Sequence, residues 1–134
     1  MRDIDASAVL RGAGIGAVFI VPGAVLSRLV GGDDGVPALG VAAFFLLVVG
    51  FALAGWAAAT QPAAERTPVQ HGTAAAAVAL VVVQVFAVVS RVASGESVRP
   101  VSIIANLLLA ASCGAVGGLL AARTINRRLE GDPS

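Results

Sequence analysis

The chain has 134 residues, of which 57% are hydrophobic and only 13% charged, and its mean hydropathy is +0.91. Soluble domains carry about a quarter charged residues, so this composition indicates a membrane protein. A formal net charge of +1 leaves no basic surface for nucleic acid. One cysteine excludes an internal disulfide, and one histidine excludes a metal site of ordinary ligand count unless carboxylates contribute.

Four apolar runs account for most of the chain. A helix needs about 20 such residues to cross the hydrocarbon core, and these runs lack the short alternating pattern of a barrel strand. We therefore predict an all-α membrane protein, a single integral domain over residues 1–134. The predicted spans are Gly12–Val30, Val36–Ala59, Gly72–Ser90 and Val101–Ala122.

The first predicted span follows basic residues, as the apolar stretch of a secretory signal would. Asp3 and Asp5 dilute that basic leader, and Ser27–Val30 offers no small-x-small cleavage site. We expect this span to be retained as a transmembrane helix.

The distribution of arginine predicts the orientation. An inside N-terminus places the larger group of arginines in the cytoplasm, namely Arg2, Arg11, Arg66, Arg123, Arg127 and Arg128, and leaves Arg28, Arg91 and Arg99 outside. Because an excess of basic residues marks cytoplasmic loops, we expect both termini, including the polar tail 123–134, to be cytoplasmic.

The two halves of the sequence resemble one another. An ungapped shift of 63 residues lays Ser27–Val30 on Ser90–Ala93 and Pro37 on Pro100, whereas the first and third spans match better at a shift of 60. We infer a tandem duplication of a two-helix hairpin, with repeats at about 10–59 and 70–122 and a cytoplasmic linker at 60–71. Copies with an even number of spans enter the membrane in the same direction, which predicts a pseudo-twofold four-helix bundle.

Small residues spaced four apart predict where the helices meet. In lipid, close association depends on residues that let backbones approach. The expected packing residues are Gly12, Gly16, Gly55, Ala59, Gly114 and Gly118. The patches around Gly55 and Gly118 should pack most tightly, near the cytoplasmic ends of the second and fourth spans.

No Asp, Glu, Lys, Arg or His side chain lies in the middle of any predicted span. Proton-coupled transporters keep a titratable group there, so the sequence disfavours that class, including the small multidrug antiporters. The run Gly12–Ala17 superficially matches a dinucleotide fingerprint, but no strand precedes it and a membrane span follows. We interpret its glycines as packing residues.

The embedded polar side chains of interest are Gln84 in the third span and Asn106 in the fourth, with Ser102 and Ser112 nearby. We expect Gln84 and Asn106 to lie at similar depth and to join the second hairpin through their amides, a contact worth about 0.6–2 kcal/mol. The alternative is a polar lining of a solute path. Pro22 removes a backbone donor from the first span and predicts a kink there.

Several residues are predicted at the cytoplasmic membrane boundary. Trp56 should anchor the second helix, His71 should be an interfacial polar cap, and the last arginines should contact anionic lipid, namely Arg123, Arg127 and Arg128. Asp33, Asp34 and Glu96 are interpreted as solvated turn residues rather than as a cation site. Cys113 is interpreted as a small packing residue.

The run Gly50–Ala59, the pair His71–Gly72 and the run Gly114–Leu120 together resemble the YrzE-like small membrane proteins. These are four-helix bacterial proteins with glycine-rich second and fourth helices and no established activity. The resemblance implies residence in the bacterial inner membrane, and it carries over no catalytic residue.

The sequence shows no nucleophile–base pair, metal cluster or phosphate loop. We accordingly expect no enzymatic activity, no catalytic or metal-binding residue and no cofactor. The expected function is a structural or interaction module whose partners are membrane lipids and either further copies of itself or another membrane protein. The alternative is a small channel or facilitator lined by Gln84, Asn106 and Ser112.

Overall fold

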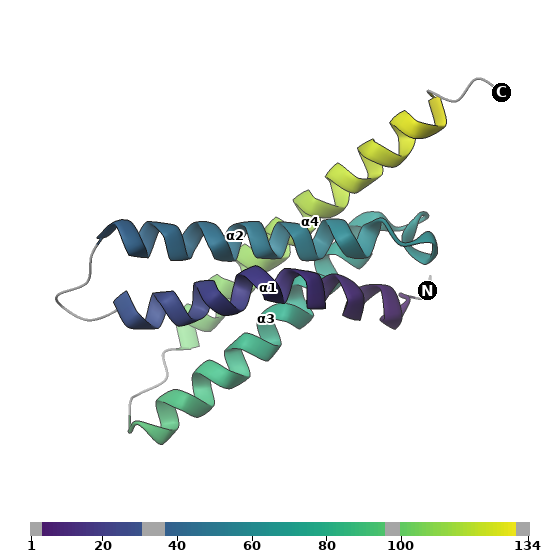
Figure 1. Cartoon of the computed structure of the whole chain (residues 1–134). Helices are drawn as coiled ribbons and strands as arrows, with labels where there is room; N and C mark the ends of the chain where they lie inside the picture. Colours follow the sequence, from purple (N-terminus) through teal and green to yellow (C-terminus); the bar gives the residue numbers. More distant parts are fainter. Residues whose placement is uncertain (1–3, 31–36, 96–99, 131–134) are drawn as a thin grey trace.

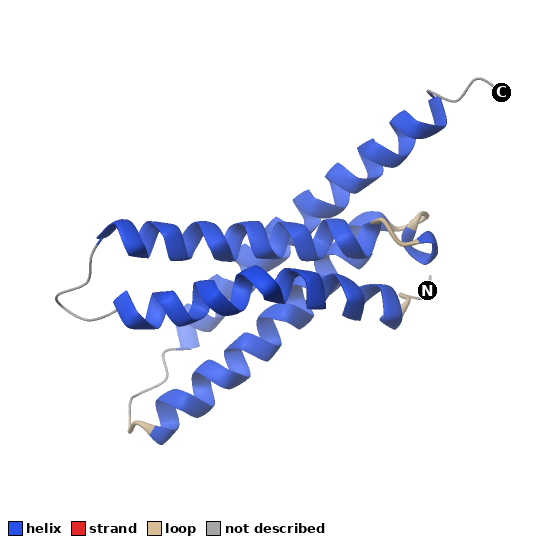
Figure 2. Cartoon of the chain, viewed as in Figure 1, coloured by secondary structure: helices blue, strands red, loops and turns tan. Residues whose placement is uncertain are grey.

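The computed structural model describes residues 4–30, 37–95 and 100–130, and Figures 1 and 2 show that its regular structure is helical. There are four long helices and one short 3-10 helix, η1 (Pro62–Ala64), which lies between the second and third long helices. The long helices are α1 (Ala6–Val30), α2 (Pro37–Ala59), α3 (Pro68–Ala93) and α4 (Pro100–Glu130). Each contains a segment long and apolar enough to cross a membrane. The prediction of an all-α protein with four spanning helices is confirmed, and the chain is a multi-pass membrane protein.

Three of the four helices are longer than the apolar runs that predicted them, and α2 matches its predicted span to within one residue. Helix α1 begins at Ala6, more than a turn before Gly12, and α4 continues to Glu130, two turns beyond Ala122. Backbone hydrogen bonds within a helix do not depend on the surrounding solvent, so a helix can continue into water beyond the apolar run. Three of the four helices begin with a proline, which suits the first helical turn because its missing N–H would have no partner there.

The ends of the helices divide between two ends of the bundle (Figure 1). One end, here called the linker end, holds the start of α1, residues 60–67 and the end of α4. The opposite end, called the hairpin end, holds the last turns of α1 and α3 and the first turns of α2 and α4. This arrangement fits an even number of membrane crossings.

Helices α2 and α3 are both central to the packing, because each contacts all three of the other long helices. Helices α1 and α2 run side by side, whereas α3 and α4 cross them obliquely, and the end of α4 extends beyond the bundle (Figure 1). An exact twofold axis would make the α2–α3 contact equivalent to an α1–α4 contact. Of these two, only the α2–α3 contact is extensive in the described part of the chain.

All four helices contribute to one core, which consists largely of alanine. Its buried members are Ala13, Ile20, Phe51, Ala76, Ala79, Leu80 and Ala110. Because alanine side chains fill little space, the helix axes approach closely, and the bulky side chains turn outward. Phe44 and Phe45, for example, are 51% and 61% exposed.

Candidate functional site

The tightest contact in the molecule joins α2, α3 and α4 near the linker end. A Cβ atom added to Gly72 would lie 2.6 Å from the carbonyl oxygen of Gly114 and 3.1 Å from the Cα atom of Gly118. One added to Gly55 would overlap the backbone of Gly114, and one added to Gly117 would overlap a carbonyl of α2. We call these five residues, Gly55, Gly72, Gly114, Gly117 and Gly118, the glycine junction. Their missing side chains let the three backbones touch.

A similar contact holds α1 against α2. A Cβ atom on Gly12 would lie 2.6 Å from that of Ala58, and one on Gly16 would lie 2.6 Å from that of Ala54. Ala59 is also fully buried. The structure therefore places the five glycines singled out in the sequence against neighbouring helices, together with Gly72 and Gly117, which the fourfold spacing did not select.

The contacts within the two hairpins correspond. Gly12 lies against Ala54 in the first hairpin, and Gly72 lies against Gly114 in the second. Each residue of the second pair stands 60 positions after its counterpart. By these contacts, residues of α1 and α2 correspond to residues of α3 and α4 that come 60 positions later in the chain. The sequence comparison had instead aligned the second and fourth spans at a shift of 63.

His71, in the first turn of α3, is fully buried, with 0% of its surface exposed. Its Nε2 atom accepts a hydrogen bond of 3.0 Å from the backbone N–H of Asp5. A backbone N–H can only donate, so this geometry requires an Nε2 atom without a proton and an Nδ1 atom that carries one. The Nδ1 atom lies 3.0 Å from the carbonyl oxygen of Thr67 and 3.1 Å from its hydroxyl.

Asp5 caps the first turn of α1. Its Oδ1 atom accepts hydrogen bonds from the Ser7 hydroxyl at 2.6 Å, the Ser7 N–H at 2.7 Å and the Ala8 N–H at 3.1 Å. These bonds, with that from the Ser7 hydroxyl the most effective, hold the pKa of Asp5 below its usual 3.8. We call Asp5, Ser7, Thr67 and His71 the polar knot. It fastens the start of α1 to the start of α3.

The polar knot changes the interpretation of His71. The sequence predicted an interfacial cap of its own helix, but the side chain is buried and its Nε2 atom binds a different helix. Asp5 and Thr67 were not selected as its partners, because the residues that meet at His71 lie 66 positions apart. The sequence did contain signals that helices start at these residues: Asp5 shortly before Ser7 is a typical N-cap pattern, and Thr67 precedes a proline.

The polar residues within the spans do not gather at one place. Gln84 is half-buried on α3, whereas Asn106 and Ser112 are exposed on α4. The Ser112 hydroxyl donates to the carbonyl of Leu108 at 2.8 Å. No hydrogen bond joins Gln84 to Asn106 among the residues that the structure describes.

The register of α3 against α4 shows how Gln84 and Asn106 lie relative to one another. Gly72 lies against Gly118, and continuing this antiparallel register along the helices places Gln84 level with Asn106. Their depths therefore agree with the expectation. Asn106, however, is turned to the surface of α4, so the two amides are level but unconnected.

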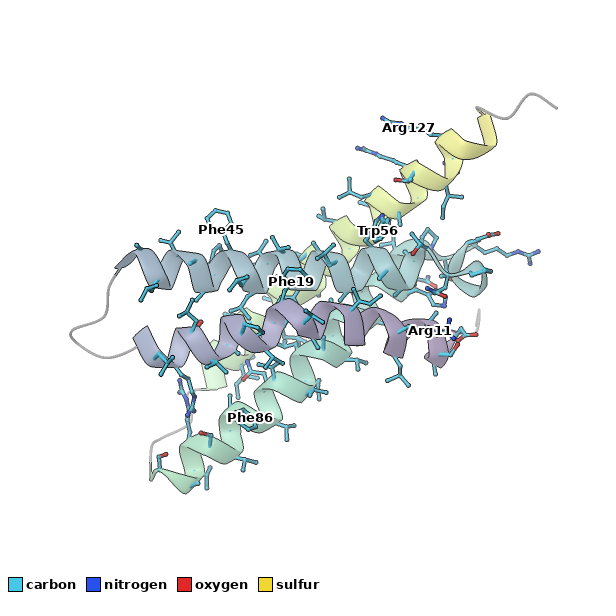
Figure 3. All side chains as sticks on the ribbon, viewed as in Figure 1. Arg11, Phe19, Phe45, Trp56, Phe86 and Arg127 are labelled. Atoms are coloured by element: carbon cyan, nitrogen blue, oxygen red, sulfur yellow. The ribbon has the colours of Figure 1, made fainter. Side chains whose placement is uncertain are left out.

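At the linker end, Trp56 is 41% exposed, and Arg123 and Arg127 are exposed on the projecting end of α4 (Figure 3). The side chain of Arg128 lies outside the described residues. Pro22 is exposed, and α1 continues through it without a break in its helical assignment.

The remaining predicted residues are the acidic turn residues and Cys113. Asp33, Asp34 and Glu96 lie outside the described residues. Cys113 is half-buried and packs against the core. Within residues 4–30, 37–95 and 100–130, no group of three or more His, Cys, Asp or Glu side chains is placed to hold a metal ion.

The hairpin end carries one contact that the sequence did not predict. The Arg28 guanidinium donates to the Ser90 hydroxyl at 2.6 Å and to the Ala87 carbonyl at 3.1 Å. The last turns of α1 and α3 are thereby tied together.

Comparison with models of known protein families, with curated proteins and with solved structures finds no match for this chain.

Proposed function

We propose that this protein is a non-enzymatic structural or interaction module of the bacterial inner membrane. The observation that carries the proposal is the division between its interior and its surface. The interior consists largely of alanine and other apolar side chains and of glycine backbones in contact, whereas the polar side chains Asn106 and Ser112 face outward from α4. A solute path would instead gather polar groups around a common axis. Outward polar groups favour contacts with other membrane components.

We also propose that both termini are cytoplasmic and that the chain arose by duplication of a hairpin. The first proposal is supported by the arginine bias and by the position of both terminal helix ends at the linker end. The second is supported by the Gly12–Ala54 and Gly72–Gly114 contacts, which recur at one shift of 60. Membership of the YrzE-like proteins is a proposal that rests on the glycine-rich runs of the second and fourth helices.

Flux measurements test the proposed function against a channel. The purified protein is reconstituted into liposomes, and the movement of ions and small neutral solutes is compared with that in empty liposomes. We expect no added flux, and no difference between the native chain and Asn106→Leu. Solute movement that depends on the protein and is abolished by Asn106→Leu would contradict the module and favour a facilitator.

A further inference from the structure

Helix α4 carries a second stripe of residues beside the face that packs in its own bundle. Its members are Asn106, Leu109, Cys113, Val116 and Leu120, which follow one another at intervals of three and four. This is the spacing of the a and d positions of a coiled coil, with Asn106, Cys113 and Leu120 at a. We call it the heptad stripe.

The heptad stripe lies on the surface of the bundle. Asn106, Val116 and Leu120 are exposed, whereas Leu109 and Cys113 are half-buried, and Cys113 also touches the core. Helices α2 and α3 contact α4 through a neighbouring face, formed by the glycine junction. A further helix could therefore pack on the heptad stripe without displacing either neighbour.

Asn106 gives the heptad stripe hydrogen-bonding groups that lipid chains cannot satisfy. It lies in the second turn of α4, among the exposed apolar side chains of Ile104, Leu107 and Leu108. Its amide has one acceptor oxygen and two N–H donors, and a bond to its own helix would satisfy only one of these groups. Acyl chains offer no hydrogen-bond partner, so the remaining groups favour a polar partner within the membrane.

We propose that a second copy of this chain covers the heptad stripe, with the two α4 helices parallel and the two Asn106 amides paired. The amide is self-complementary, since each copy donates an N–H to the oxygen of the other. An asparagine at a single a position also favours two strands in register. This inference rests on the proposed function, because it names the partner of the interaction module.

In this arrangement the native Cys113 can report whether the dimer forms. Cys113 occupies the a position one heptad after Asn106, so the two copies of its thiol would face each other across the dimer. Ile104 is exposed at nearly the same depth as Asn106, but it lies on the far side of α4 from the stripe. It provides a matched control position.

The test is oxidative crosslinking of the full chain in native membranes. We expect the native chain to form a disulfide-linked dimer through Cys113. In a Cys113→Ala background, Val116→Cys should crosslink efficiently and Ile104→Cys should not. Equal crosslinking from Val116→Cys and Ile104→Cys, or adducts with a protein of another size, would overturn the second copy as the occupant.

A dilution series in liposomes measures the contribution of Asn106. Resonance energy transfer between labelled copies should report dimerisation that Asn106→Leu weakens by about 3- to 30-fold, while Asn106→Gln, which keeps an amide, retains most of it. Unchanged thermal unfolding of both variants shows that the bundle is intact. A native chain that stays monomeric, or an Asn106→Leu variant that dimerises as well as the native chain, overturns the proposal.

The two proposals fail separately. Absence of the dimer in liposomes that remain impermeable contradicts only the α4 interface. Protein-dependent solute flux contradicts the module whether or not the chain dimerises.

Discussion

Gly55 and Gly114 meet backbone to backbone, and the fit depends on the absence of two Cβ atoms. Gly14 of α1, by contrast, faces open space: apart from the adjoining backbone of its own helix, nothing lies within 4 Å of the position of a Cβ. The same residue type therefore has different roles at these two places. Only the first is a packing requirement.

Gly55→Ala should destabilise the bundle, because the added methyl group overlaps the Gly114 backbone, which cannot move aside as a side chain can. Overpacking of this kind costs about 1–3 kcal/mol. The free energy of unfolding is measured by titrating detergent-solubilised protein with dodecyl sulfate. The matched control, Gly14→Ala, should be neutral or stabilising by up to about 1 kcal/mol, and equal effects at both positions would refute the glycine junction.

His71→Leu should loosen the start of α1. The substitution leaves the Asp5 N–H without its acceptor, and a buried unsatisfied donor costs about 1–3 kcal/mol. Hydrogen–deuterium exchange over residues 4–8 should accelerate in His71→Leu and remain closer to native in His71→Gln, whose side-chain oxygen can accept the same bond. Unchanged exchange in His71→Leu would show that the polar knot does not hold α1.

The capping carboxylate of Asp5 predicts a dependence on pH. Because hydrogen bonds lower its pKa in the folded chain, its stabilising effect is complete above 3.8 and is lost as the pH falls through the lower folded value. Carbon NMR of the Asp5 carboxyl measures that pKa directly. Ser7→Ala removes the leading cause and should raise the pKa toward 3.8, whereas the distant Ser94→Ala should leave it unchanged.

At the scale of the element, α4 changes character along one exposed face. Val116 and Leu120 are exposed and apolar, and Arg123 and Arg127 continue the same face beyond them. An apolar-to-basic change along a helix marks a membrane boundary. We therefore expect the arginines on the projecting end of α4 to reach lipid headgroups.

The double variant Arg123→Gln, Arg127→Gln should bind anionic lipid more weakly, by about 1 kcal/mol for each arginine. Native mass spectrometry in mixed micelles can count bound phosphatidylglycerol and phosphatidylcholine. We expect a selective loss of phosphatidylglycerol and no change in Thr124→Ala, which alters the same turn without altering charge. A parallel loss of both lipids would indicate a change in structure instead.

At the scale of the whole molecule, four crossings require the two terminal helix ends to lie on one side of the membrane. Exposed residues are available at both ends of the bundle, namely Glu65 and Asn126 at the linker end and Ser94 at the hairpin end. They allow the orientation to be measured on the intact chain.

In a Cys113→Ala background, a membrane-impermeant maleimide should label Ser94→Cys in intact cells. Glu65→Cys and Asn126→Cys should be labelled only after the membrane is permeabilised, because the proposed orientation places both in the cytoplasm. Reversed labelling would contradict the orientation alone. Labelling of Glu65→Cys and Asn126→Cys from opposite sides would contradict the four-crossing fold.

The sequence by itself determined the four helices, because apolar length and the need to satisfy backbone groups in lipid are local properties. It also located the small residues Gly12, Gly55 and Gly114, since spacing by four defines a helical face. Helix ends were less predictable, and α4 continues beyond Ala122 because helical hydrogen bonding does not stop where lipid does.

Only the tertiary structure decided which residues meet. The partner of His71 lies 66 residues away, and the exposure of Asn106 follows from the contact face that the glycine junction gives α4. Both depend on the crossing of helices that are distant in sequence. Periodicity defines the faces of each helix, but the pairing of those faces is set by the close backbone contacts of the assembled bundle.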